Sequence, residues 1–350
     1  MRIFCGSLLF ILLILATQAA AWGQTGRPAS LAELARYTGV DRERILVEGA
    51  KKEGKVVWYT SLTTYKEIAK VFEAKYPGVK VEAYRGNSSE IMSRIMNEAK
   101  ARRNVVDAIE TTPPALMVFR DEKLLMPFTT PNIGAYPEDS KEDAQNKLFY
   151  WVSDRESFIG LGYNKNSVAA KDVPKNFQDL LNPALRGKLA ISGTETGERV
   201  VGAILKVKGE EFVRKLKDQG IKLHMISGGA LNELVASGEV TLSPTIFRNH
   251  VLQAQEKGSP VAWVPMDLVV SNAGGAAVAA NGQRPHAALL FTDFLLGAEG
   301  QKIMEEKFKF GSALKNYGFT RWYPEKGLTT SQYEAANNKW NKLMLEISRK

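Results

Sequence analysis

The 350-residue sequence predicts an α/β protein of two lobes, each built on a mainly parallel sheet flanked by helices. Three observations support this prediction. Short apolar segments alternate with amphipathic ones, the alternation occurs in two separate series, and two extended apolar segments stand beside the second series. Alternating strands and helices are joined by crossover connections, which cover both faces of a parallel sheet with helices. We therefore expect one sheet from each series and a double connection between the lobes.

The first series starts with a predicted strand at 55–60 (KVVWYT). A helix follows, in which apolar residues repeat at i, i+3, i+4 and i+7, and Pro77 ends it. Strands at 79–84 and 105–109 lead into further helices in the same way. Because ligands of such sheets bind beyond the carboxyl ends of the strands, the candidate ligand-binding residues of this lobe are those that follow its strands: Thr60, Ser61, Asn87, Ser88, Thr111 and Thr112.

The second series has predicted strands at 188–192, 222–226, 240–242 and 261–264, and helices at 199–208, 230–237 and around 250–256. A glycine-rich loop follows the first of these strands. Exposed N–H groups and the positive end of the helix dipole make helix starts attractive to anions. The candidate ligand-binding residues of this lobe therefore lie in the loops and at the helix starts: Ser192, Gly193, Thr194, Ser227, Gly228, Phe247 and Arg248.

Two extended apolar segments, 157–164 (SFIGLGYN) and 267–279 (DLVVSNAGGAAVA), are the predicted hinge strands. A helix over 287–307 is expected to return to the first lobe, and 317–350 to pack as helices. The predicted division is a first lobe of 22–157 plus 272–312 and a second lobe of 158–271 plus 313–350.

The first 21 residues have the layout of a secretory signal peptide: Arg2, an apolar run over 8–15, and small residues up to Ala21. We expect cleavage near Ala21 and export to the periplasm; a retained membrane anchor is the alternative. Cys5, the only cysteine, precedes the apolar run, so it is not the lipid-carrying cysteine of a lipoprotein. The mature chain is then free of cysteine, and its core alone must stabilise it.

The composition is that of a globular protein, with 44% hydrophobic and 24% charged residues. The net charge of +9 comes from lysines and arginines that stand beside acidic residues along predicted helices, which is typical of solvated helix faces. Motifs for nucleic-acid binding, a G-x-S-x-G nucleophile turn and an H-E-x-x-H metal motif are absent from the sequence. The sequence therefore predicts a binding protein, with no enzymatic activity, no cofactor and no nucleic-acid partner.

The order of the motifs EGKVVWYTSL, VVDAIE, IGLGYN, NPALRGKLAIS, ALNELVASGEV and GGAAVAANGQRPHAALLFTDFLLGAEGQ resembles that of a known family. This family is the periplasmic solute-binding proteins of ABC importers, extracellular solute-binding protein family 1, in the branch near the ferric-iron-binding proteins. The resemblance implies a type II periplasmic-binding-protein fold with two hinge crossovers. It also implies capture of a small solute by hinge closure, a monomer, and ABC permease subunits as partners. A periplasmic sensor subunit that signals to a membrane receptor is the alternative.

Ferric-binding relatives commonly place two adjacent tyrosines where this chain has Ile246 and Phe247. Neither side chain can donate an electron pair to a metal, and Arg248 beside them would repel a cation. His250 is the remaining metal candidate, although a cap or a structural donor is the commoner role of such a histidine. We therefore expect no metal ligands and a small anionic solute, held by helix starts with Arg248 or Arg199 as a clamp. Ferric-ion transport through other ligands is the alternative.

Overall fold

The computed structural model describes residues 28 and 30–348; the predicted signal peptide and its cleavage near Ala21 lie outside the described residues. The strands are β1 (Lys55–Thr60), β2 (Lys80–Arg85), β3 (Ala108–Thr111), β4 (Leu125–Met126), β5 (Lys141–Asp143), β6 (Phe149–Asn164), β7 (Ala190–Ser192), β8 (Lys222–His224), β9 (Leu242–Phe247), β10 (Val261–Val264), β11 (Val269–Ala279) and β12 (Arg321–Trp322). The α-helices are α1 (Leu31–Arg36), α2 (Arg42–Glu53), α3 (Tyr65–Lys75), α4 (Ser88–Lys100), α5 (Pro113–Asp121), α6 (Glu195–Lys208), α7 (Glu210–Lys215), α8 (Gly228–Ser237), α9 (Arg248–Glu256), α10 (Pro285–Leu296), α11 (Ala298–Lys302) and α12 (Thr330–Ser348).

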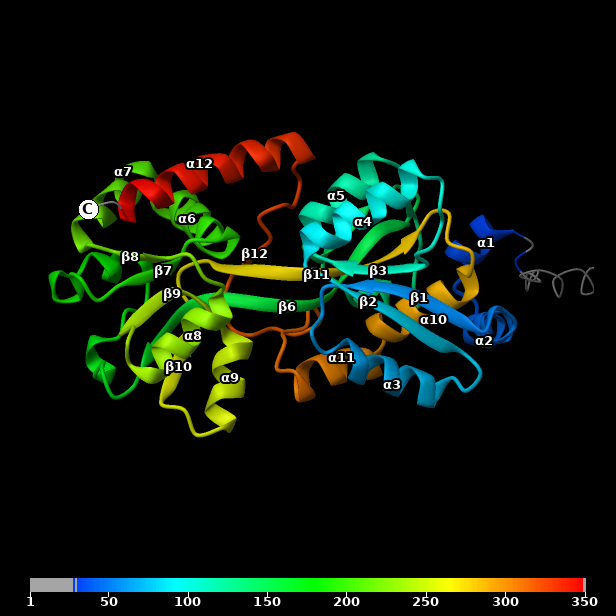
Figure 1. Ribbon diagram of the computed structural model, residues 1–350, viewed down its shortest axis with the longest axis horizontal. Helices are drawn as coiled ribbons and strands as arrows, with labels where there is room; N and C mark the ends of the chain where they lie inside the picture. The colour runs from blue at the N-terminus through cyan, green and yellow to red at the C-terminus, as the bar shows by residue number, and fades with distance from the viewer. Residues whose placement is uncertain (1–27, 29, 349–350) are drawn as a thin grey trace, which may run out of the picture.

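These elements form two α/β bodies that lie side by side and are joined by the long strands β6 and β11 (Figure 1). We name the body around β1 to β5 lobe 1; it carries α1 to α5, α10 and α11. We name the body around β7 to β10 lobe 2; it carries α6 to α9. The α/β class and the two-lobed architecture predicted from the sequence are confirmed.

Lobe 1 is built on strands that pair in parallel, β2 with β1 and β1 with β3. Because successive side chains of a strand point to opposite faces, neighbouring residues of β1 enter different cores. Trp58 packs with Phe72 and Phe291 beneath α3 and α10, and its ring lies 4.8 Å from that of Phe291. Tyr59 packs with Phe119 on the opposite face, under α4 and α5. The helices therefore cover the two faces of the sheet, as the alternation predicts.

Lobe 2 follows this plan only in part: it has a separate two-stranded parallel sheet, whereas its strands β9 and β10 belong to the same sheet as the strands of lobe 1. Strand β7 pairs in parallel with β8, and the backbone of β9 pairs with β6. A core that includes Phe177, Val213 and Leu242 lies between these strands and the helices. Strand β9 extends beyond the predicted segment 240–242 because its pairing with β6 continues to Phe247. This register shifts around Pro244, which has no N–H to donate to a neighbouring strand.

The two long strands run antiparallel through both lobes, with Ile159 opposite Val270 at one end and Trp151 opposite Ala277 at the other. Strand β6 has 16 residues and begins eight positions before the predicted hinge segment, whereas β11 matches its prediction closely. The prediction of mainly parallel sheets is therefore correct for β1 to β3 and for β7 with β8. It is wrong for β9 and β10, which both pair antiparallel with β6, and for the crossovers. The crossovers are antiparallel because β6 leaves lobe 1 and β11 returns to it.

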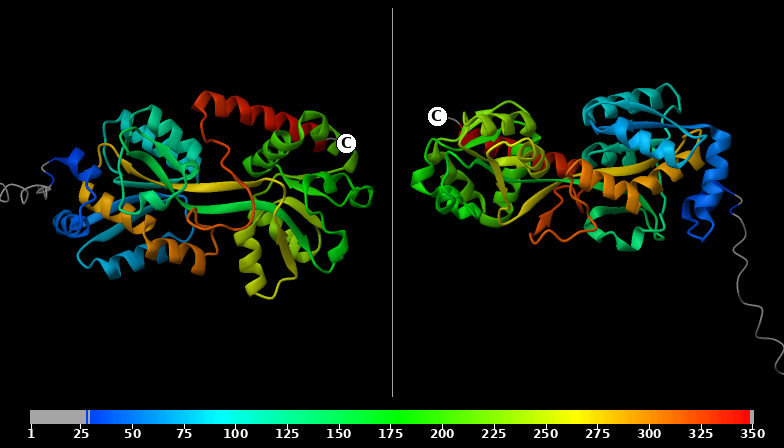
Figure 2. Two further views of the ribbon diagram at one scale, coloured as in Figure 1. Left: turned by 180° about the vertical axis from the view of Figure 1, so that it is seen from behind. Right: turned by 90° about the horizontal axis from the view of Figure 1, so that it is seen from below.

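The C-terminal part of the chain contacts both lobes. The predicted helix 287–307 is interrupted at Gly297, where α10 ends and α11 begins. The chain then follows the long strands, with Gly311 paired to Glu156, before α12 starts (Figure 2). In the first turn of α12, Thr330 donates a hydrogen bond of 2.5 Å to Asp121 of lobe 1. The last turns of α12 bury Met344 and Ile347 in the core of lobe 2.

Candidate functional site

The carboxyl ends of the strands in the two lobes point toward the middle of the long strands. In lobe 1, Thr111 at the end of β3 lies opposite Gly275 of β11, beyond which β11 continues toward lobe 2. In lobe 2, Phe247 at the end of β9 lies opposite Ile159 of β6. The loops that follow these two strands therefore lie near the junction between the lobes.

In lobe 1, Thr60 and Ser61 are directed at a buried carboxylate that the sequence analysis missed. Glu110 is fully buried, and its Oε2 atom accepts hydrogen bonds from Thr60 Oγ1 at 2.6 Å, from the Ser61 N–H at 3.0 Å and from Ser61 Oγ at 3.1 Å. The guanidinium Nη2 of Arg155 lies 3.0 Å from Glu110 Oε1 and donates to Ser61 Oγ at 3.2 Å. We call the donors of Thr60, Ser61 and Arg155 the β1 nest.

The other candidates of lobe 1 lie away from the β1 nest. Glu110 and Thr111 are successive residues of β3, so their side chains point to opposite faces of the sheet. Thr111 donates a hydrogen bond to Ser88 Oγ at 3.0 Å, and Ser88 Oγ lies 2.8 Å from the hydroxyl of Thr112. The structure thus brings Ser88, Thr111 and Thr112 together, but on the other face.

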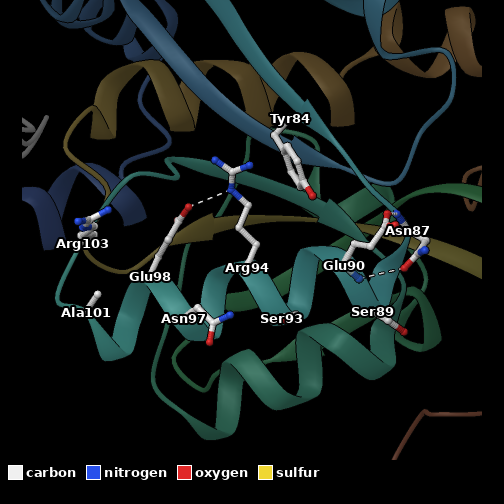
Figure 3. A pocket seen from close by; sticks show the side chains of 10 residues that line it. All are labelled: Tyr84, Asn87, Ser89, Glu90, Ser93, Arg94, Asn97, Glu98, Ala101 and Arg103. Carbon is white, nitrogen blue, oxygen red and sulfur yellow. Dashed lines mark hydrogen bonds and ion pairs between the residues drawn. The ribbon is translucent and has the colours of Figure 1, made fainter.

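Asn87 is further out, where it caps α4 and lines an open groove of about 740 Å³ between β2 and α4 (Figure 3). One of the two arginines that line this groove is already engaged. The guanidinium of Arg94 lies 4.1 Å from the centre of the Tyr84 ring and forms an ion pair of 3.0 Å with Glu98. Asn87 is therefore a helix cap on the surface of lobe 1.

In lobe 2, the candidates come together where three helices begin. Thr194, Ser227 and Phe247 are the N-cap residues of α6, α8 and α9. Ser192 joins two of these starts, since its hydroxyl lies 2.8 Å from that of Thr194 and donates to the carbonyl of Ile226 at 2.7 Å. The first backbone N–H groups of a helix have no partner within the helix. The arrangement therefore gathers three sets of N–H donors at one place.

Two glycines allow this close approach. A Cβ atom on Gly228 would lie 2.7 Å from the ring of Phe247, and one on Gly193 would lie 2.3 Å from the sulfur of Met225. Phe247 also packs edge-on against His250, at 5.3 Å between ring centres. The first turns of α8 and α9 are therefore in direct contact, and Phe247 lies between them.

The two arginines named as possible clamps differ. Arg199 is buried and forms ion pairs of 2.6 Å with Glu325 and 2.7 Å with Glu195, so its charge is already compensated. Arg248 is partly exposed at the first position of α9, and its guanidinium lies 5.2 Å from the centre of the Tyr317 ring. Within the described part of the chain, no carboxylate forms an ion pair with Arg248. Arg248 therefore has a charge available to a ligand.

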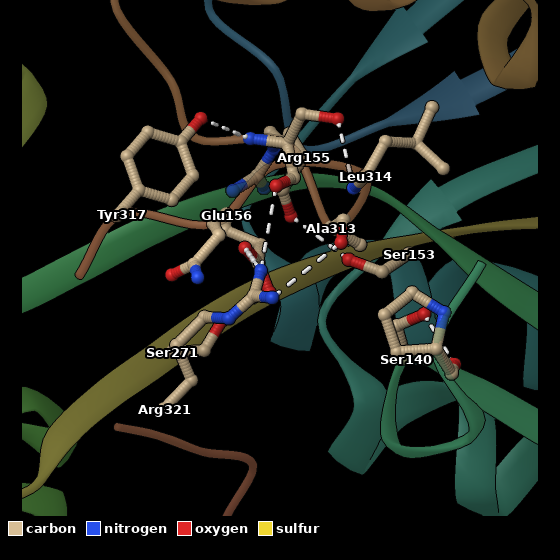
Figure 4. A network of polar contacts seen from close by, with 12 residues as sticks. Ser140, Ser153, Arg155, Glu156, Ser271, Ala313, Leu314, Tyr317 and Arg321 are labelled. Atoms are coloured by element: carbon tan, nitrogen blue, oxygen red, sulfur yellow. Dashed lines mark hydrogen bonds and ion pairs between the residues drawn. The ribbon is translucent and has the colours of Figure 1, made fainter. Parts of the chain in front are cut away.

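A polar network that the sequence analysis also missed fills the middle of the long strands (Figure 4). Glu156 accepts hydrogen bonds from Arg321 at 2.7 Å, from Ser271 at 3.1 Å and from Tyr323. Asp154 is the extra residue at a bulge of β6, is fully buried, and has no hydrogen-bond partner for its carboxyl oxygens within the described residues. Burial and the nearby charge of Glu110 raise the pKa of Asp154. The run DRE inside an apolar strand was the available signal.

A match to a protein-family model shows which family the chain belongs to. Residues 60–308 match the family model for bacterial extracellular solute-binding proteins.

The chain belongs to this family.

Its relatives among solute-binding proteins are distant. A Haemophilus influenzae protein of uncharacterised function is 25% identical over 267 residues, which are 73% of this chain and 76% of the relative. A Salmonella typhimurium protein described as a candidate 2-aminoethylphosphonate-binding periplasmic protein is 26% identical over 255 residues, covering 66% and 69%. Iron-bound HitA from Pseudomonas aeruginosa has the same fold, with a TM-score of 0.64 and 22% identity, and the match covers 84% of this chain and 99% of HitA. The predicted type II periplasmic-binding-protein fold and the relation to ferric-binding proteins are confirmed.

In this solute-binding protein, the positions suggested for an iron-binding tyrosine pair are apolar and largely buried. Ile246 has no exposed surface and packs in a core of lobe 2. Burial lowers the pKa of His250, which favours the uncharged imidazole. Within the described residues, no group of three or more histidine, cysteine, aspartate or glutamate side chains is placed to hold a metal ion.

Proposed function

We propose that this chain is the substrate-binding component of an ABC importer, that it works in the periplasm, and that it captures a small anionic solute between its lobes. The observation that supports the anionic solute best is the convergence of three helix starts in lobe 2, together with an arginine that pairs with no carboxylate among the described residues. Membership of the solute-binding family supports the role in import.

The chemistry of lobe 2 favours an anion for two reasons. Each helix start carries free N–H groups and the positive end of the helix dipole, and both attract negative charge. The hydroxyl of Ser227 accepts from the Ala230 N–H and keeps its own proton to donate to a ligand oxygen. Arg248 can add a bidentate contact to a carboxylate or a phosphoryl group. Phosphates, phosphonates and carboxylates are therefore the solute classes that this lobe suits.

Ferric ion suits the same place less well. Fe³⁺ needs oxygen ligands, whereas the positions of the expected tyrosines hold the buried Ile246 and the aromatic Phe247, with the positive Arg248 beside them. The relatives include one described for an aminoalkylphosphonate and one with bound iron, so family membership alone leaves both solutes open. The side chains favour the anion.

The import role needs release as well as capture. We propose that the lobes close around the solute by bending at β6 and β11, that the closed form is the one that permease subunits bind, and that the protein acts as a monomer. Throughout the described residues, no helix is long and apolar enough to cross a membrane.

A binding panel tests the proposal. The mature protein is screened by thermal shift against inorganic phosphate, 2-aminoethylphosphonate, a sugar phosphate, a dicarboxylate and ferric citrate, and hits are measured by calorimetry. A ligand that binds only the folded state raises the melting temperature by mass action. We expect a shift with a phosphonate or phosphate and none with iron alone. Binding of Fe³⁺ with a visible charge-transfer band, and of no anion, would overturn the anionic assignment.

A further inference from the structure

The β1 nest has the composition of an anion site. It contains two hydroxyls, one backbone N–H and one guanidinium, which are the groups that bind carboxylates and phosphates in proteins. All of them are directed at Glu110, whose two carboxyl oxygens have no exposed surface. In lobe 1, these anion-binding groups are therefore already occupied by the carboxylate of Glu110, a residue of the same chain.

We propose that Glu110 is a specificity determinant: as an internal anion it fills the β1 nest and excludes solutes that carry a second anionic group. This inference rests on the proposed function, in which lobe 2 binds an anionic head group. The end of the solute that faces lobe 1 is then uncharged or cationic, as in a zwitterion or an alcohol. A solute with a carboxylate at that end finds no free donor and meets the carboxylate of Glu110.

The long strand β11 is shaped to accommodate this internal anion. A Cβ atom on Gly274 would lie 2.5 Å from Glu110 Oε1 and 2.9 Å from both Arg155 Nε and Asp154 Oδ1. Such distances are too short for any side chain to fit without displacing these groups. The absence of a side chain at position 274 therefore makes room for the charged cluster at the place where the lobes join.

The cluster has no positive charge to spare. Arg155 is compensated by Glu110, with nitrogen to oxygen distances of 3.0 and 3.2 Å. Asp154 is the third ionisable group, and burial raises its pKa, so its neutral form is favoured. By contrast, none of the hydrogen bonds that Ser192, Thr194 and Ser227 make within the described chain goes to a carboxylate. Free positive potential is thus found at lobe 2 and not at the β1 nest.

A pair of matched ligands tests the inference. 2-Aminoethylphosphonate and 3-phosphonopropionate share a phosphonate head and differ in an ammonium or a carboxylate at the other end. By calorimetry, we expect the wild-type protein to bind the first at least tenfold more tightly. In Glu110→Gln, which removes the charge of this side chain, the preference should fall below threefold. Glu82→Gln is the control, because it removes a half-exposed carboxylate of lobe 1 that pairs with Lys55.

A second measurement is independent of the solute. Glu110→Ala empties the nest, so sodium formate should raise its melting temperature above that in sodium chloride, and should not do so for the wild type. If the wild type binds no anion and formate still stabilises Glu110→Ala, the β1 nest is an anion-binding site, but the proposed capture of an anionic solute is wrong. Equal affinity of the wild type for the two phosphonates, or wild-type discrimination in folded Glu110→Gln, overturns the inference. So does a folded Glu110→Ala protein that shows no formate effect.

Discussion

The strand ends of the two lobes carry the same residue types and use them differently. In lobe 1, the hydroxyls of Thr60 and Ser61 and a backbone N–H are bound to the carboxylate of Glu110. In lobe 2, Ser192 and Thr194 bond to each other and to backbone, beside three helix starts and Arg248, which pairs with no carboxylate in the part of the chain that the structure describes. The difference teaches that serine and threonine after a strand do not mark a ligand site by themselves. What matters is whether the chain also supplies the acceptor.

The largest effect is expected from a substitution of Gly274, which lies against the charged cluster around Glu110. Gly274→Ala places a Cβ atom within 3 Å of Glu110, Arg155 and Asp154, so the charged cluster must shift. We expect a loss of about 1–3 kcal/mol in the free energy of unfolding, measured by urea denaturation. Gly134→Ala is the matched control, because a Cβ atom there meets nothing within 4 Å. Equal stability of the two variants would show that the cluster around Glu110 is not tightly packed.

The next largest effect is expected in lobe 2, from a substitution of Arg248. Arg248→Ala removes the available positive charge from the start of α9, and we expect more than tenfold weaker binding of an anionic ligand by calorimetry. Arg214→Ala is the control, since Arg214 lies on the surface of the same lobe in pairs with Glu210 and Glu346. If Arg248→Ala binds as the wild type does, Arg248 does not belong to the binding site.

A substitution of Ser227 distinguishes a role in capping α8 from a role in binding the solute. Its side chain accepts a hydrogen bond of 3.2 Å from the N–H of Ala230 and so caps α8. Ser227→Ala should reduce the free energy of unfolding by about 1 kcal/mol, the usual loss for an N-cap. Ser237→Ala, at the other end of the helix, should change stability by less than about 0.5 kcal/mol. If Ser227 also contacts the solute, the affinity of Ser227→Ala falls as well; a change in stability alone restricts it to capping.

The smallest expected effect concerns pH. Because the folded state raises the pKa of Asp154, the folded protein binds more protons than the unfolded one, and stability falls as pH rises above the ordinary aspartate value of about 3.9. Asp154→Asn removes this contribution. We expect its melting temperature to exceed that of the wild type at neutral pH, with the difference shrinking toward pH 4. Asp218→Asn, on the surface, is the control, and a pH-independent difference would contradict the assignment.

Local patterns predicted most of the secondary structure. The helices α3 and α4 follow from apolar spacing and from end signals such as the cap at Asn87, which depend on neighbouring residues only. The full length of β6 was missed because Asp154, Arg155 and Glu156 interrupt its apolar pattern. Those charges are accommodated by groups from distant segments, such as Glu110 and Arg321. A single sequence does not show which distant segments will meet.

The candidate site could be predicted only in part. Strand ends and helix starts located Ser192, Thr194 and Ser227, which the fold does bring together. The same reasoning grouped Asn87 with Thr60, although they lie at different places in lobe 1, because strand position alone does not say which face a side chain takes. Glu110 was overlooked because a lone acid at the end of a short apolar strand has no local signal of its partners.

The C-terminal helix α12 limits how the two lobes can move relative to each other. Two adjacent strands, β6 and β11, form a narrow ribbon, and a ribbon alone allows the bodies it joins both to bend and to twist. α12 adds a third attachment away from that ribbon, held to lobe 1 through Thr330 and buried in lobe 2 through Met344 and Ile347. A third attachment that is out of line with the two strands resists rotation of one lobe about the ribbon. Any opening or closing of the molecule must therefore deform or release the contacts of α12 with one of the lobes.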